Sequence, residues 1–399
     1  MIRWIIVCFV FALLPGSDIH AQVGDNEKVA EKLNIFTART EGYFHYRVPG
    51  MIVTPKGSIL AYCEARESHG DWANIDFVLT RSEDGGKTWS KRRVIADAGD
   101  KTVNNIVGFS DHQTNTVHFL YCINYSRVFY IKSTDDGKTF SEPREITSSL
   151  ESLKQHYDWN VIAIGPGHGI QMDNGRLLAS LWMSPGELRN DGSRRHRPSA
   201  ISVIYSDDHG KSWKTGEVIF EDGDMVNGEE VINPSESTVI QLDDGSVMIN
   251  TRNESEIHRR LTAVSENGMD DWKNKQFHSQ LLEPICMGSM VRLTEGETFD
   301  KTRMLFVNPN NLFDNDGGKN KIRQNITIKL SYDEGKNWPV SKVIEPGLSG
   351  YPDISVGPDH MIYLIYENGG INGNHYDPEH LTFMKLNLEW LTENADSVN

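Results

Sequence analysis

Ser82-Glu-Asp84-Gly-Gly86-Lys-Thr88-Trp89 is a phrase that the chain repeats as Ser133-Thr-Asp135-Asp-Gly137-Lys-Thr139-Phe140, Ser206-Asp-Asp208-His-Gly210-Lys-Ser212-Trp213 and Ser331-Tyr-Asp333-Glu-Gly335-Lys-Asn337-Trp338. A degenerate fifth copy runs from Ser265 to Trp272. Each of the four copies follows an apolar run that is typical of a strand: residues 76–81, 128–132, 200–205 and 326–330.

The residue types of this phrase predict a β-hairpin turn. Its aspartate can accept hydrogen bonds from backbone N–H groups of the turn, and the glycine at its fifth position can adopt a positive φ. The final Trp or Phe provides apolar area to bury beneath the hairpin. Because the phrase recurs at intervals of about 50 to 70 residues, it predicts an all-β fold of stacked units, a β-propeller.

The N-terminal residues predict an export signal. Arg3 precedes an apolar run from Trp4 to Leu14, which is too short to span a bilayer and is typical of a signal-peptide core. Cleavage is expected after Ala21, so residues 1–21 are interpreted as a signal peptide and residues 22–399 as one domain. No other segment is long and apolar enough to span a membrane. We therefore expect a periplasmic or extracellular protein.

Charge and cysteine content restrict the partners. The net charge of −16 argues against nucleic acid or an anionic membrane surface as a partner. An anionic substrate would need a local cluster of arginines. Cys63, Cys122 and Cys286 show no Cys-x-x-Cys spacing and indicate no zinc site; the sequence leaves open whether two of them pair or all three are buried thiols.

A candidate site begins at a predicted hairpin from Tyr46 to Arg66, which carries Arg47 near one end and is followed by a polar loop with Asp71. Further candidate segments carry polar or charged residues beside predicted strands: Gly165–Ile170, Pro234–Arg252, Arg323–Ile328, Gly350–Asp353 and Tyr366–Glu367. In this order, they resemble the exo-α-sialidases (neuraminidases) of the bacterial and animal superfamily. Val48 stands where the family's Arg-Ile-Pro signature usually has Ile.

The resemblance implies a six-bladed propeller and a role for each candidate residue. Arg47, Arg252 and Arg323 would bind the carboxylate of a sialic acid. Tyr351 would be the nucleophile, Glu236 its base and Asp71 the acid/base. Arg66 would lie at the same rim; Glu64 would support Arg66 and Glu367 would support Arg47, although an ordinary structural salt bridge explains either glutamate equally well.

The resulting function prediction is a retaining exo-α-sialidase that acts on sialylated glycans without a cofactor. No metal site is predicted, because the histidines are scattered and no His-Glu-x-x-His motif occurs. Two alternatives remain open. One is a hydrolase for a related 2-keto acid sugar, Kdn or Kdo, which the pocket near Trp72 and Ala73 would decide; the other is a non-catalytic propeller that binds glycans or proteins.

Overall fold

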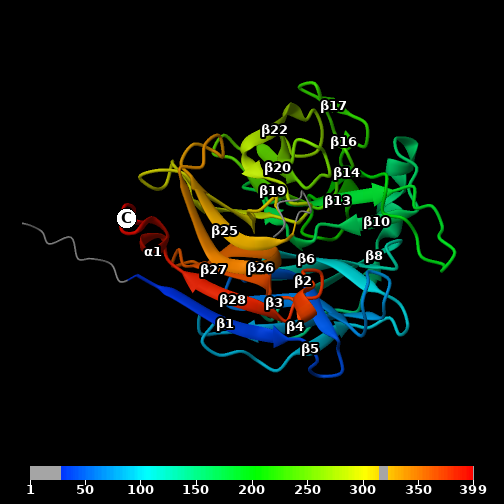
Figure 1. Cartoon of the computed structure of the whole chain (residues 1–399), viewed down its shortest axis with the longest axis horizontal. Helices are drawn as coiled ribbons and strands as arrows, with labels where there is room; N and C mark the ends of the chain where they lie inside the picture. The colour runs from blue at the N-terminus through cyan, green and yellow to red at the C-terminus, as the bar shows by residue number, and fades with distance from the viewer. Residues whose placement is uncertain (1–27, 314–321, 399) are drawn as a thin grey trace, which may run out of the picture.

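The computed structural model describes residues 28–313 and 322–398, so the predicted signal peptide lies outside the described residues. The described chain is nearly all β, which confirms the predicted fold class. Figure 1 shows its sheets following one another around the molecule, from blue through green to red. No helix within the described ranges has the length and apolar character needed to cross a membrane.

The first four sheets are antiparallel apart from one short parallel pairing between β11 and β6. One contains β2 (His45–Val53), β3 (Ile59–Arg66), β4 (Ile75–Ser82) and β5 (Arg93–Ala96). The next contains β6 (Val103–Asp111), β7 (Thr116–Ile123), β8 (Arg127–Ser133), β9 (Arg144–Glu145) and β11 (Gly167–His168). A third contains β10 (Val161–Ile164), β12 (Ile170–Gln171), β13 (Leu177–Ser184), β14 (Ala200–Ser206), β15 (Lys214–Thr215) and β16 (Phe220–Glu221). The fourth contains β19 (Ser237–Gln241), β20 (Val247–Thr251), β21 (Arg259–Ser265) and β22 (Lys273–Leu282).

The last large sheet has seven strands and joins the two ends of the described chain. It contains β23 (Ser289–Thr294), β24 (Arg303–Pro309), β25 (Gln324–Ser331), β26 (Val340–Val356), β27 (Ile362–Asn368), β28 (His380–Leu386) and β1 (Ala30–Thr37). The first half of β26 pairs with β25 and its second half with β27. Divided at this point, the sheet supplies two four-stranded units, the second of which is completed by the pairing of β1 with β28.

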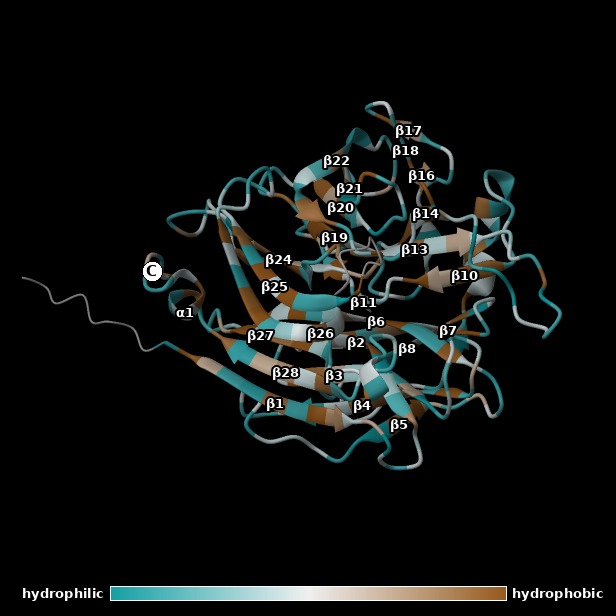
Figure 2. Cartoon of the chain, viewed as in Figure 1, coloured by the Kyte–Doolittle hydropathy of each residue, from teal (hydrophilic) through white to brown (hydrophobic). Residues whose placement is uncertain are grey.

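The remaining elements are short. They are the hairpin of β17 (Met225–Val226) and β18 (Glu229–Glu230), the 3-10 helices η1 (Thr147–Gln155) and η2 (Ile371–Gly373), and the helix α1 (Leu388–Thr392). Apolar residues concentrate along the strands of the large sheets, and polar residues concentrate in the loops (Figure 2). One core cluster joins Leu120 of β7 to Leu181 of β13, so apolar side chains fill the space between neighbouring sheets. The three described cysteines are buried and unpaired, which favours the thiol alternative over a disulfide.

The repeated phrases form the predicted turns. In the first copy, Asp84 accepts the backbone N–H of Thr88 at 2.9 Å and its hydroxyl at 2.6 Å. The hydroxyl oxygen of Ser82 accepts the N–H of Gly86 at 2.9 Å. Gly86 has φ +87°, and a Cβ there would lie 2.4 Å from the ring of Phe383. A glycine is therefore required both by the backbone and by the close approach of β28.

These turns also hold neighbouring sheets together. A Cβ at Gly137 would lie 2.8 Å from Leu60 of β3, and one at Gly210 would lie 2.5 Å from the hydroxyl of Tyr130 of β8. Each turn therefore packs against the sheet that precedes its own. The phrase that identifies the repeat in the sequence therefore forms contacts between one sheet and the next.

Candidate active site

Residues from several sheets meet at a cavity of about 240 Å³. The candidate residues that line it are Arg47, Glu64, Arg66, Asp71, Glu236, Arg252, Arg323 and Tyr351. Glu367 is buried behind this lining and contacts Arg47. The fold therefore brings together side chains that are as much as 320 positions apart in the sequence.

The hairpin of β19 and β20 positions Glu236 and Arg252 side by side. Glu236 directly precedes β19 and Arg252 directly follows β20, and the N–H of Arg252 donates to the carbonyl oxygen of Glu236 at 3.0 Å. The hydroxyl of Tyr351 donates to Glu236 Oε1 at 2.5 Å. Arg252 Nη1 donates to the other carboxylate oxygen of Glu236 and, at 2.7 Å, to the Tyr351 hydroxyl oxygen. Phenol, carboxylate and guanidinium thus form one connected group.

Burial raises the pKa of Tyr351 above its ordinary value. Arg252 and Arg323 act in the opposite direction by favouring the phenolate, whereas Glu236 disfavours a second negative charge beside it. Because the net effect is a raised pKa, the Tyr351 hydroxyl stays protonated near neutral pH. The phenol can lose its proton during a reaction only if a neighbouring base accepts it.

Arg47 and Tyr351 share one buried carboxylate. Glu367 accepts hydrogen bonds from Arg47 Nε at 2.9 Å and Arg47 Nη2 at 3.3 Å. It also accepts the backbone N–H groups of Val48 and Tyr351, both at 3.1 Å. Burial opposes ionisation of Glu367, but Arg47 outweighs it and the pKa of this glutamate is lowered. A Cβ at Gly350 would lie 2.2 Å from Glu367 Oε2, so a glycine is needed where β26 passes this carboxylate.

Irregularities in the two strands occur at these residues. The register of β2 shifts between Arg47 and Gly50, and that of β26 shifts between Ser349 and Pro352. Bulges of this kind change the direction in which a strand's side chains point and are frequent next to functional sites. Here they lie at the positions of Arg47 and Tyr351.

Arg323 is held differently from the other arginines. Its Nη2 donates to the carbonyl oxygen of Ile285 at 2.8 Å. Its guanidinium carbon lies 4.9 Å from the ring centre of Tyr351 and 5.0 Å from that of Tyr376. Such cation–π contacts orient a guanidinium group without neutralising it. Arg323 therefore keeps its charge available to an anion in the cavity.

Arg66 connects two carboxylates. It donates to Glu64 Oε2 through Nε at 3.1 Å and Nη2 at 2.5 Å, and to Asp71 Oδ1 through Nη1 at 3.0 Å. The Glu64 carboxylate also accepts the N–H of Asn105 at 3.0 Å. Asp71 is half exposed, and its reduced solvation inside the cavity opposes ionisation, but Arg66 and then Arg47 outweigh this effect and lower its pKa below the usual range. Asp71 is therefore ionised in the structure.

Sequence reasoning missed an aromatic wall beside the catalytic candidates. Tyr125, Trp182 and His196 line the cavity, with ring centres 4.5 Å apart for Tyr125 and His196 and 5.2 Å apart for Trp182 and His196. Burial lowers the pKa of His196 to about 4, so its imidazole is neutral at neutral pH. Tyr376, half exposed at the cavity, was also missed. No sequence motif distinguishes these aromatic residues from core residues.

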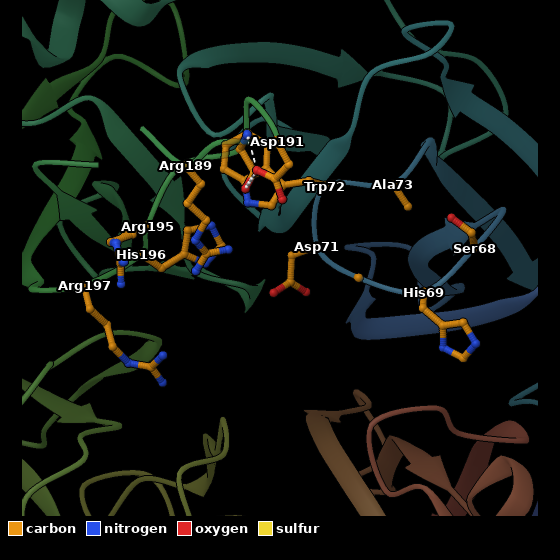
Figure 3. A pocket seen from close by; sticks show the side chains of 12 residues that line it. Ser68, His69, Asp71, Trp72, Ala73, Arg189, Asp191, Arg195, His196 and Arg197 are labelled. Carbon is orange, nitrogen blue, oxygen red and sulfur yellow. Dashed lines mark hydrogen bonds between the residues drawn. The ribbon is translucent and has the colours of Figure 1, made fainter. Parts of the chain in front are cut away.

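A second hollow of about 580 Å³ adjoins the cavity. Figure 3 shows Asp71 in this hollow, between the arginines of residues 189–197 on one side and His69 on the other. Trp72 and Ala73, which the sequence assigned to a specificity pocket, line this hollow and not the cavity that contains Tyr351. Among residues 28–313 and 322–398, no group of three or more His, Cys, Asp or Glu side chains is arranged to hold a metal ion.

A family model described as a BNR repeat-like domain matches residues 57–364. The chain belongs to this family. The chain is also similar to proteins called sialidases: one of Micromonospora viridifaciens is 29% identical over 377 residues, and one of Bacteroides fragilis (strain YCH46) is 26% identical over 379 residues. These alignments cover 88% and 86% of this chain. The resemblance to sialidases in the sequence is thereby confirmed. The chain spans only 53% and 62% of the length of these two relatives.

Solved structures of sialidases share the fold of this BNR repeat-like protein. The Hadza microbial sialidase Hz136 superposes with a TM-score of 0.73 at 24% identity, covering 90% of this chain and 69% of that one. An intramolecular trans-sialidase from Ruminococcus gnavus gives 0.68 at 16% identity, with coverage of 90% and 98%. A Trypanosoma rangeli sialidase, solved as a covalent intermediate with 2,3-difluorosialic acid, gives 0.69 at 18% identity, with coverage of 92% and 60%. These likenesses confirm the predicted β-propeller fold.

Proposed function

We propose that this protein is a retaining exo-α-sialidase that removes terminal sialic acids from glycans through a tyrosyl-enzyme intermediate. The observation that carries the proposal is the 2.5 Å hydrogen bond from the Tyr351 hydroxyl to Glu236, in a cavity lined by Arg47, Arg252 and Arg323. The sialidase relatives add support, because their similarity extends over most of this chain.

The three arginines match the distinctive group of the substrate. A sialic acid carries a carboxylate on its anomeric carbon, and guanidinium groups bind carboxylates through directed, charge-assisted hydrogen bonds. Arg47 is oriented by the buried Glu367, Arg252 by Glu236 in the cavity wall, and Arg323 by aromatic rings. This fixed local positive charge offsets the overall charge of −16 for a negatively charged substrate.

The same carboxylate explains why a tyrosine is a suitable nucleophile. An aspartate or glutamate would bring a second negative charge to the carbon that already carries the carboxylate; sialidases are an exception among glycosidases in using tyrosine. Glu236 accepts the proton of Tyr351 as the phenol oxygen attacks. Arg252, which donates to that oxygen, stabilises its developing negative charge.

Asp71 acts at the leaving group. It protonates the glycosidic oxygen as the bond breaks, and it later removes a proton from the water that hydrolyses the tyrosyl intermediate. Arg66 positions Asp71 through their 3.0 Å hydrogen bond, while Glu64 holds Arg66 from the buried side. Two displacements at one carbon give net retention of configuration.

Proton NMR of fresh product from an aryl α-sialoside tests the mechanism. The α-anomer should appear first and mutarotate later; first appearance of the β-anomer would refute a double displacement. A cyclised sugar with no free anomeric hydroxyl would indicate intramolecular transfer. Tyr351→Phe should lose most turnover because only the attacking oxygen is removed, whereas Arg127→Ala, at an exposed ion pair outside the cavity, should retain it.

The sugar specificity and the location are tested separately. The 4-methylumbelliferyl α-glycosides of Neu5Ac, Kdn and Kdo, assayed side by side, should show the highest rate for Neu5Ac. Release from none of the three would favour a non-catalytic binding protein. We also propose that residues 1–21 direct export and that residues 22–399 form the catalytic domain. N-terminal sequencing of the protein isolated from its native host should then begin at Gln22.

A further inference from the structure

We propose that the hollow beside the cavity is a leaving-group subsite that favours an acidic penultimate sugar, one that carries a carboxylate or a sulfate. This inference rests on the proposed function, because it uses Asp71 as the group that protonates the glycosidic oxygen. It adds a property that the catalytic residues do not supply, namely a choice among the sugars to which the sialic acid is attached.

The position of the hollow identifies it with the leaving group. Asp71 lines both the cavity and the hollow, and His196 and Arg197 also belong to both. The oxygen that Asp71 protonates connects the two sugars, so a sugar bound in the cavity would direct its neighbour past Asp71. The hollow begins at this point. Its volume of about 580 Å³ is within the usual range of small-molecule sites.

The chemistry of the lining favours an anion. Arg189, Arg195 and Arg197 come from one loop between β13 and β14, and they lie together on one side of the hollow (Figure 3). Three guanidinium groups in one wall are notable in a chain with a net charge of −16. They present directed N–H donors that match the oxygens of a carboxylate or a sulfate.

Both carboxylates in the lining of the hollow, Asp71 and Asp191, already accept hydrogen bonds from neighbouring residues. Asp71 accepts from Arg66 at 3.0 Å, and Asp191 accepts the N–H and hydroxyl of Ser193 at 2.9 and 2.6 Å.

Two glutamates pair with arginines at the rim. Arg195 lies 3.5 Å from Glu187, and the two side chains are 59% and 74% exposed. Exposed ion pairs of this kind are weak, so a ligand anion can replace Glu187 as partner. Arg197 is held more firmly, because its partner Glu254 is only 18% exposed and accepts hydrogen bonds from both Nε and Nη2. Among the described residues, Arg189 has no carboxylate within ion-pair distance, and Asp191 of the same lining interacts with it only at longer range.

The test varies the penultimate sugar while the sialic acid stays constant. The substrates are 3′-sialyllactose, α2,8-disialyllactose and a 3′-sialyl-N-acetyllactosamine sulfated on galactose, with the 4-methylumbelliferyl sialoside as reference. The variants are Arg189→Ala and Arg195→Ala. Arg127→Ala serves as the matched control, since Arg127 is half exposed and pairs with Glu145 at 2.6 Å but lies in neither cavity nor hollow.

We expect each variant to lower kcat/KM for an acidic penultimate sugar roughly ten-fold, the effect of losing one charge-assisted contact, and to leave the aryl sialoside unchanged. A loss confined to the disialyl substrate identifies the carboxylate as the anion, and a loss confined to the sulfated one identifies the sulfate. Equal losses on 3′-sialyllactose would refute the preference for an acid, and no loss on any oligosaccharide would refute the subsite. Absence of aryl sialoside hydrolysis in the unmodified protein would instead refute the proposed function itself.

Discussion

Replacing Glu367 by glutamine tests whether one buried carboxylate holds both the first arginine and the tyrosine. Glu367 is 1% exposed and accepts four N–H groups, two from Arg47 and one each from the backbones of Val48 and Tyr351. Glutamine keeps the size of the side chain but turns one acceptor oxygen into an NH2 donor. That donor would face N–H groups, and the guanidinium of Arg47 would lose its buried counter-charge.

The magnitude follows from the burial of the pair. Removing one partner of a buried ion pair costs about 3 to 5 kcal/mol, because the other charge is left without compensation. For the roughly 360 residues that the structure describes, an unfolding entropy of about 2.1 cal/mol/K per residue converts 4 kcal/mol into a fall of about 5 °C in Tm. Since both Arg47 and Tyr351 lose an anchor, KM should rise and kcat should fall.

Calorimetry and the aryl sialoside assay measure the two effects. The matched control is Glu145→Gln, which removes the 40% exposed partner of Arg127 and should cost at most about 1 kcal/mol. If Glu367→Gln unfolded within 1 °C of Glu145→Gln and kept its kcat/KM, the shared carboxylate would not be what positions these residues.

Four further outcomes are expected. Gly350→Ala would place a methyl group 2.2 Å from the same carboxylate and should reduce kcat/KM at least ten-fold in the aryl sialoside assay. Tyr376→Ala removes one of the two rings that flank Arg323 and should raise KM several-fold, while Tyr376→Phe should not. Burial lowers the pKa of His168, but Asp353 at 2.7 Å raises it more, so the net pKa is raised. The contribution of the charged His168–Asp353 pair to the free energy of unfolding should be complete below about pH 6.5 and lost as pH rises through the raised pKa. The free energies of unfolding of the wild type and of His168→Gln, measured with denaturant, should therefore converge at high pH. An aryl sialoside whose carboxylate is converted to an amide should lose kcat as well as affinity, measured by initial rates; an unchanged kcat would contradict a coupling between the substrate's charge and Asp71.

The fold was largely predictable because its signal is local. The residues that form one turn, such as Ser82, Asp84 and Gly86, lie within five positions of each other, and their hydrogen bonds agree with their residue types. The long strand β26 and the pairing of β1 with β28 were not predictable in this way. The strand β26 is shared between two units, pairing with β25 through its first half and with β27 through its second, and no short phrase marks this division. The pairing of β1 with β28 joins residues as much as 356 positions apart, from Ala30 to Leu386.

The candidate site, like the fold, was predictable from the sequence only in part. The charged candidates were found through segments that resemble a known family, and the structure brings Arg47, Arg252 and Arg323 to one cavity. Tyr125 and Tyr376 were missed because an aromatic residue in a loop has the same sequence appearance whether it lines a cavity or fills a core. Their positions depend on how the loops of different sheets meet, which local sequence does not encode.

The expected loss of kcat for the amide follows from the charges around Asp71. A general acid must be protonated, yet Arg66 and Arg47 hold the pKa of Asp71 below its usual range. In the proposed mechanism the substrate brings a carboxylate to Arg47 and its two companions, and this negative charge offsets part of the positive potential at Asp71. At ~6 Å and an effective dielectric constant of about 20, the interaction is worth about 3 kcal/mol, enough to raise the pKa of Asp71 by about 2. Binding of the carboxylate therefore shifts Asp71 toward its protonated form, whereas a neutral amide would remove both a contact with the arginines and this rise in the pKa of the proton donor.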